Sequence, residues 1–129
     1  MKDIVFSPKF ALLYALAVCH LFYGYYFTNI YKQYGSIYIN DDAFLTKIGA
    51  FSALFNGFFK FVWATLLDYY AFRKIYGGLV CLEIFLIIVV QWAVHNDWFY
   101  LAVCCLTYMC DGSLTSMLPA ITIGQFGIK

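Results

Sequence analysis

The chain has 129 residues, of which 64% are hydrophobic and 12% are charged, and its formal net charge is +1. Soluble domains are about 45–50% apolar and about 25% charged, so this composition excludes an ordinary soluble domain and predicts an integral membrane protein. The nearly neutral charge also argues against a nucleic-acid-binding surface, which would be strongly basic.

The first two apolar stretches predict two transmembrane helices. Residues 10–31 contain no Asp, Glu, Lys or Arg, and His20 is their one histidine. The stretch exceeds the roughly 20 residues that one span requires. The second stretch, residues 43–67, follows Asn40, Asp41 and Asp42. Short polar side chains of this kind are typical of a helix N-cap, so we expect the second helix to begin there.

Two further apolar stretches complete the predicted bundle. Residues 75–94 and 98–117 each have the length of one span. Pro119 predicts the end of the fourth helix, because proline lacks the backbone N–H that a helix interior uses. Residues 118–129 are then expected to form a tail. The predicted fold is all-α, a single membrane domain over residues 1–129 with four transmembrane helices.

The basic residues outside the spans predict the orientation of the chain. One side of the predicted bundle carries five of them: Lys2, Lys9, Arg73, Lys74 and Lys129. The other side carries Lys32, with Lys47 just inside a helix end. Since basic loops tend to stay in the cytoplasm, both termini are expected on the cytoplasmic side or on the equivalent matrix side.

Three charged residues interrupt the apolar spans at similar depth. At about 1.5 Å per residue, Lys60 lies about 12 Å, Glu83 about 13 Å and Asp111 about 9 Å from the same end of the bundle. Because an unpaired ion inside a membrane is costly, we expect Lys60 to pair with Glu83 or Asp111. Such a pair could be a static contact that fixes helix register or part of a proton-coupling site, and the sequence leaves both open.

Lys60 also ends a polar stripe on the second predicted helix. Ser52, Asn56 and Lys60 recur every fourth residue, so they share one side of the helix. Gly49, Ala53 and Gly57 form an adjacent small-residue stripe of the kind that permits close helix approach. The polar stripe is therefore expected to face protein or a cavity, and not lipid.

The remaining chemistry-bearing residues predict no catalysis. His20 is interpreted as a hydrogen-bonded interior histidine in preference to a proton relay. No catalytic triad, metal-ligand spacing or phosphate-binding loop is present in the sequence. We therefore expect no enzyme activity, no cofactor and no metal site.

Several segments together resemble the major facilitator superfamily. They are YKQYG (31–35), NDDAFL (40–45), FNG (55–57), Trp63, Asp68 and the closing segments PA (119–120) and QFG (125–127). The chain is most similar to the C-terminal half of monocarboxylate or oxalate/formate-type transporters, over the first four helices of that half. The resemblance implies a facilitator-like helical fold.

The resemblance also implies roles for individual residues. At the position of Lys60 the family usually has an arginine that binds a substrate carboxylate, so Lys60, Asn56 and Ser52 are the implied substrate contacts. The inner-loop motif of the superfamily survives here only as Asp68 followed by Arg73 and Lys74. Lysine keeps the charge of arginine but lacks its bidentate fork.

Two functions are compatible with these features. The first is a reduced facilitator-derived subunit, structural or accessory in a larger membrane complex and not transporting by itself, because a facilitator works by rocking two six-helix halves. A mitochondrial respiratory complex of the inner membrane is one compatible host. The alternative is part of a transporter for small carboxylates, with proton coupling through Glu83 or Asp111. The expected partners are lipid and other membrane subunits.

Overall fold

The computed structural model describes residues 8–126, which form four α-helices. They are α2 (Pro8–Gly35), α3 (Asp42–Tyr69), α4 (Phe72–Ala93) and α5 (Asp97–Phe126). Each is long and apolar enough to cross a membrane, so the prediction of an all-α protein with four candidate spans is confirmed. Every helix extends beyond its predicted bounds at one or both ends.

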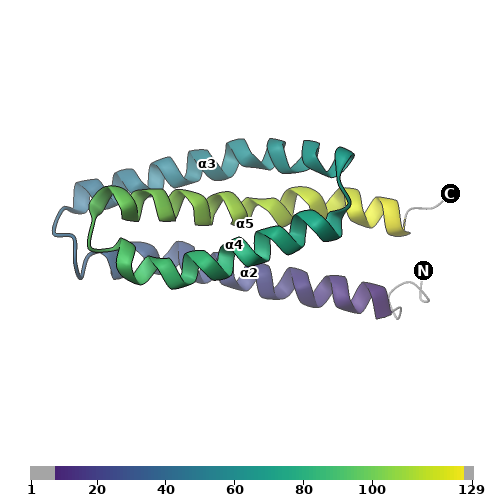
Figure 1. The fold of residues 1–129 in the computed structure, drawn as a ribbon, viewed down its shortest axis with the longest axis horizontal. Helices are drawn as coiled ribbons and strands as arrows, with labels where there is room; N and C mark the ends of the chain where they lie inside the picture. Colours follow the sequence, from purple (N-terminus) through teal and green to yellow (C-terminus); the bar gives the residue numbers. More distant parts are fainter. Residues whose placement is uncertain (1–7, 127–129) are drawn as a thin grey trace.

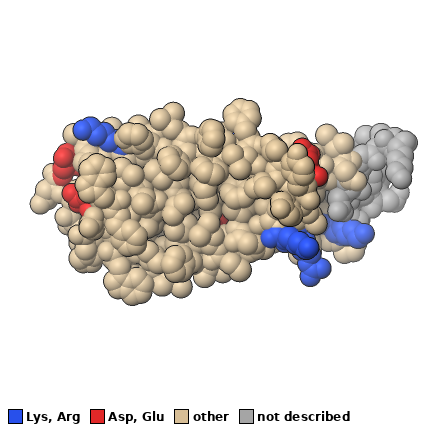
Figure 2. All heavy atoms as spheres, turned by 45° about the horizontal axis from the view of Figure 1, so that its top comes forward, with Lys and Arg blue, Asp and Glu red and all other residues tan. Residues whose placement is uncertain are grey.

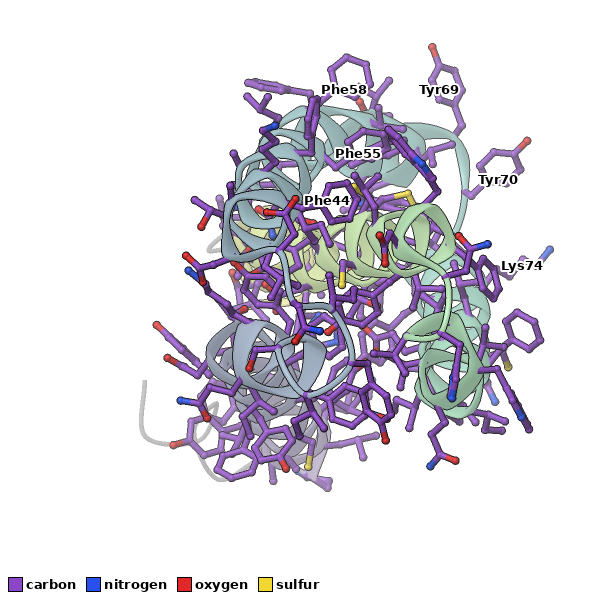
Figure 3. The ribbon with its side chains drawn as sticks, turned by 90° about the vertical axis from the view of Figure 1, so that its left-hand side faces the viewer. Phe44, Phe55, Phe58, Tyr69, Tyr70 and Lys74 are labelled. Carbon is purple, nitrogen blue, oxygen red and sulfur yellow. The ribbon has the colours of Figure 1, made fainter. Side chains whose placement is uncertain are left out.

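The helices run up and down in one bundle, as Figure 1 shows. The start of α2, the end of α5 and the short link between α3 and α4 lie at one end, and the other two links lie at the opposite end. Viewed from that opposite end, α5 occupies the middle, with α3 on one side and α2 and α4 on the other (Figure 3). Phe58 and Tyr69 of α3 point away from the bundle in the same view.

Helix α5 is the core of the molecule. Its fully buried side chains are mostly small or polar, and they include Val103, Cys104, Thr107, Cys110 and Ser113. Small residues permit close helix packing in membranes, and here α3 packs against α5 more extensively than any other pair of helices does. On the surface, charged side chains gather at the two ends of the bundle, and the middle of the visible face is almost free of them (Figure 2).

The helix starts follow from local polar side chains. Asp41 is the N-cap of α3, and its carboxylate accepts a hydrogen bond of 2.9 Å from the Phe44 amide. This confirms the predicted cap. At the start of α5 the Asn96 side-chain oxygen accepts from the amides of Trp98 and Phe99, at 3.2 and 3.3 Å.

The predicted end of the fourth helix is wrong, because α5 continues through Pro119 to Phe126. Proline removes one backbone donor, but hydroxyl side chains of transmembrane helices can restore hydrogen bonding nearby. The acceptor that Pro119 leaves without its backbone amide is the carbonyl of Thr115, four residues earlier. In the turn that follows, the Thr122 hydroxyl donates to the carbonyls of Leu118 and Pro119 at 2.9 Å each. The described part of residues 118–129 is therefore helix and not a tail.

Candidate functional site

One polar residue from each helix lies at the middle of the bundle. His20, Asn56, Glu83 and Asp111 each lie within two residues of the midpoint of their own helix. We call these four residues the midplane layer. Their helices are 22–30 residues long, or about 33–45 Å, against roughly 30 Å of hydrocarbon, so the layer lies near the centre of the four candidate spans.

His20 and Glu83 form the buried half of the layer. The His20 Nδ1 and Glu83 Oε1 atoms are 3.5 Å apart, and the two residues are only 4% and 8% exposed. On its other side the His20 Nε2 atom lies 3.3 Å from the backbone carbonyl oxygen of Asp111. A carbonyl oxygen only accepts hydrogen bonds, so Nε2 must carry a hydrogen.

This arrangement makes the contact between His20 and Glu83 a site for one proton. With Nε2 as a donor, a neutral His20 presents a lone pair at Nδ1, which the charged carboxylate would repel. A proton on either Nδ1 or Glu83 converts that repulsion into attraction. The distance of 3.5 Å is within ion-pair range and longer than an ordinary hydrogen bond of about 2.7–3.2 Å. The sequence-based interpretation of His20 as an interior histidine agrees with its burial.

Asn56 and Asp111 form the accessible half of the layer. The Asn56 amide donates to the carbonyl oxygen of Tyr108 at 2.9 Å and to the Asp111 Oδ2 atom at 3.4 Å. The other Asp111 oxygen lies against Gly24 of α2, where a Cβ would overlap the carboxylate. Glycine at this position therefore makes room for an acidic side chain between α2 and α5.

A groove beside Asp111 opens between α2, α3 and α5, with a volume of about 330 Å³. We call it the midplane groove. Its polar lining comes from Tyr25 and Thr28 of α2, Asn56 of α3, and Tyr108, Asp111 and Thr115 of α5. Because Asp111 is only partly buried, its carboxylate remains reachable from this groove.

Lys60 does not occupy the place that the sequence predicted. Among residues 8–126 no carboxylate lies within 4 Å of its ammonium, and the side chain is exposed. The acid Glu83 is paired with His20 instead. Asp111 and Lys60 are close enough to interact electrostatically, but they form no direct ion pair.

The predicted polar stripe also divides between two environments. Ser52 is fully buried, and its hydroxyl lies 3.7 Å from the Cys105 sulfur. Asn56 is partly buried, whereas Lys60 is exposed, so Lys60 does not face the interior of this bundle as Ser52 and Asn56 do. The reason is geometric: residues four apart differ by about 40° around a helix, which turns Lys60 about 80° away from Ser52.

The small-residue stripe is only partly used inside the bundle. A Cβ at Gly49 would overlap the Tyr31 hydroxyl, so this glycine allows α2 to approach α3. Ala53 is exposed, and nothing lies within 4 Å of a Cβ placed at Gly57. The stripe therefore packs against α2 at one end and is open at the other.

The remaining predicted residues lie at the end of the bundle and not at the midplane layer. Asp68, Arg73 and Lys74 are exposed around the short link between α3 and α4. Lys74 and Tyr70 point outward there, as Figure 3 shows. No group of three or more His, Cys, Asp or Glu side chains able to hold a metal occurs within residues 8–126.

Two site residues were missed by sequence reasoning. Gly24 had no assigned role, and His20 was not connected to Glu83. The pairing of His20 with Glu83 could have been found from depth, since both residues lie at the centre of their spans. Compared with known proteins, the chain matches no family model, no curated protein and no solved structure.

Proposed function

We propose that this protein is a structural or accessory subunit of a larger membrane assembly, derived from a facilitator and not transporting by itself. The supporting observation is the exposed position of Lys60 on α3, nine residues before the end of that helix. A lysine inside the hydrocarbon costs from roughly 2.5 kcal/mol to more than 10 kcal/mol. A neighbouring protein that supplies a counter-charge would remove most of this cost.

The facilitator origin is part of the proposal and rests on the resemblance of the sequence segments. Lys60 is then an inherited substrate-binding cation that now serves protein contact. In the same proposal both termini lie on the cytoplasmic side or the mitochondrial matrix side of the membrane. Lys9, Arg73 and Lys74 would lie on that side too. A respiratory complex of the mitochondrial inner membrane is the proposed kind of host.

The test is purification of the full chain from its native membrane in mild detergent. We expect it to migrate as part of a larger particle, and Lys60→Ala to release it while leaving the helical circular dichroism spectrum unchanged. Lys47→Ala is the matched control, because Lys47 is an exposed lysine on the same helix near its other end. Migration of the unaltered chain as a single bundle would refute the proposal.

Transport of small carboxylates is the second candidate, and the midplane layer is the observation that favours it. Ionisable side chains at the centre of a membrane commonly belong to substrate or proton pathways. In that function Lys60 would bind the carboxylate, with Asn56 and Ser52 nearby, and Glu83 or Asp111 would exchange the proton. The test is uptake of a labelled carboxylate into vesicles, which Lys60→Ala should abolish and Lys47→Ala should not.

A further inference from the structure

The side of α3 that borders the midplane groove carries the cation Lys60 and lies next to the anion Asp111. At about 100° per residue, Lys60 projects between Asn56 and Ala53, and both of these residues line the groove. Lys60 is exposed, and Asp111 lines the same groove with its carboxylate only partly buried. We call this surface, made by Ala53, Asn56, Gly57, Lys60 and Asp111, the groove face.

We propose that the groove face binds the same face of a second copy of this chain, with Lys60 of each copy paired to Asp111 of the other. The inference rests on the proposed function and names its partner. A surface that carries both signs of charge is complementary to itself when a two-fold axis relates the copies. Each lysine then gains a carboxylate, and each open carboxylate gains a cation.

The depths of the two charges fit this arrangement. Copies inserted with the same topology share a two-fold axis along the membrane normal, so equal residues stay at equal depth. Asn56 is hydrogen-bonded to Asp111, and Lys60 follows Asn56 by four residues, or about 6 Å along α3. The flexible four-carbon stem of lysine can bridge an offset of this size.

The backbone of α3 also permits a close approach. Ala53 is exposed, and Gly57 has open space where a Cβ would be. Small residues four apart allow transmembrane helices to pack closely. The bulky exposed side chains of Phe55 and Phe58 lie on other sides of α3, and Phe61, about 40° from Gly57, borders this face at its edge.

The test is complementation between two differently tagged full-length copies, measured by co-purification in mild detergent. Lys60→Asp and Asp111→Lys should each reduce self-association at least tenfold, because like charges then meet. Co-expression of the two variants should restore association to within about twofold, since every pair is again opposite in sign. Lys47→Asp, on the same helix and outside the groove face, should have no effect.

Disulfide cross-linking in membranes provides a readout that leaves both charges in place. The substitutions Cys19→Ser and Cys81→Ser first remove the two exposed native cysteines. In that background, chains with Ala53→Cys should form a disulfide with the same position of a second copy. Phe58→Cys is the control on another side of α3 and should stay monomeric. Absence of a cross-link at both Ala53→Cys and Gly57→Cys would overturn the proposal.

The outcomes separate this inference from the proposed function. Recovery only when both substitutions are in the same chain would show that Lys60 and Asp111 pair within one copy, and would overturn the inference. A large particle that contains a single copy would also overturn it and leave the accessory-subunit function intact. A monomer without partners would refute both.

Discussion

Glu83 and His20 are buried against each other, so removing either one leaves a polar group alone in the membrane. In soluble proteins, breaking a buried ion pair by deleting one partner costs about 3–5 kcal/mol. We expect Glu83→Ala to lower the thermal midpoint of the purified protein strongly and Glu83→Gln to lower it less, because the amide still offers polar partners to His20. Thermal unfolding in detergent measures the difference.

The control for this pair is Asp68→Ala, which removes an exposed carboxylate at the end of α3. Its thermal midpoint should stay close to that of the unaltered chain, because surface substitutions typically change the free energy of unfolding by less than about 0.5 kcal/mol. An equal loss from Asp68→Ala and Glu83→Ala would mean that the contact between Glu83 and His20 contributes nothing specific.

Gly24 provides a second test at the scale of a single residue. Gly24→Ala places a methyl group where the Asp111 carboxylate lies, so either the side chain or α2 must move. We expect reduced thermal stability, although alanine is the better helix former by about 1 kcal/mol. Gly77→Ala on α4 is the matched control, since nothing lies within 4 Å of its Cβ, and it should be neutral or stabilising.

At the residue scale, sequence reasoning predicted the shared depth of Glu83 and Asp111 and did not predict which neighbours they face. Counting residues placed Glu83 and Asp111 at similar depth, and both lie in the midplane layer. Counting did not reveal which side of each helix faces which neighbour. That depends on the rotation of four packed helices, and it is why Glu83, one of the two expected partners of Lys60, is instead the partner of His20.

The start of α3 allows a prediction at the scale of an element. Asp41→Ala removes the side chain that accepts from the Phe44 amide, and loss of such a cap typically costs about 0.5–2 kcal/mol. We expect a modest decrease in thermal midpoint together with faster hydrogen exchange confined to the first turn of α3. Asn40→Ala, one residue earlier, should change neither quantity, and a decrease of the same size there would argue against the cap.

Helix α5 shows where element prediction has its limit. The proline rule correctly identifies a lost donor at Pro119, but it is calibrated on helices in water. Within an apolar span no water competes for the backbone, so leaving the helix would cost more than keeping one carbonyl short of a donor. The hydroxyl of Thr122 further supports the turn around Pro119, and the helix continues.

At the scale of the whole molecule, the arrangement of four candidate spans places the links alternately at opposite ends. A membrane-impermeant thiol reagent should therefore label Ser36→Cys and Tyr70→Cys from opposite sides of a sealed vesicle. Ser36 is exposed in the link between α2 and α3, and Tyr70 in the link between α3 and α4. Labelling of both positions from the same side would refute the topology of α3 as a span.

The number and length of helices could be predicted because hydrophobicity marks a span. The central place of α5 could not be predicted in this way, because the apolar window of α5 has a mean hydropathy of 1.4, whereas that of the more exposed α4 has 2.1. Lipid is as apolar as a protein core, so hydrophobicity does not tell inside from outside. Small and hydroxyl-bearing residues on α5, such as Ser113 and Thr107, are the better signal.

The midplane layer has a consequence for the order in which the chain matures. The ribosome synthesises α5 after α2, α3 and α4, yet His20 of α2 and Asn56 of α3 both have backbone hydrogen-bond partners on α5, at Asp111 and Tyr108. Before α5 is inserted, the side chains of His20 and Asn56 lack these partners and face lipid or the insertion machinery. A chain shortened before residue 97 would therefore present polar residues in every span and be a ready substrate for membrane quality control.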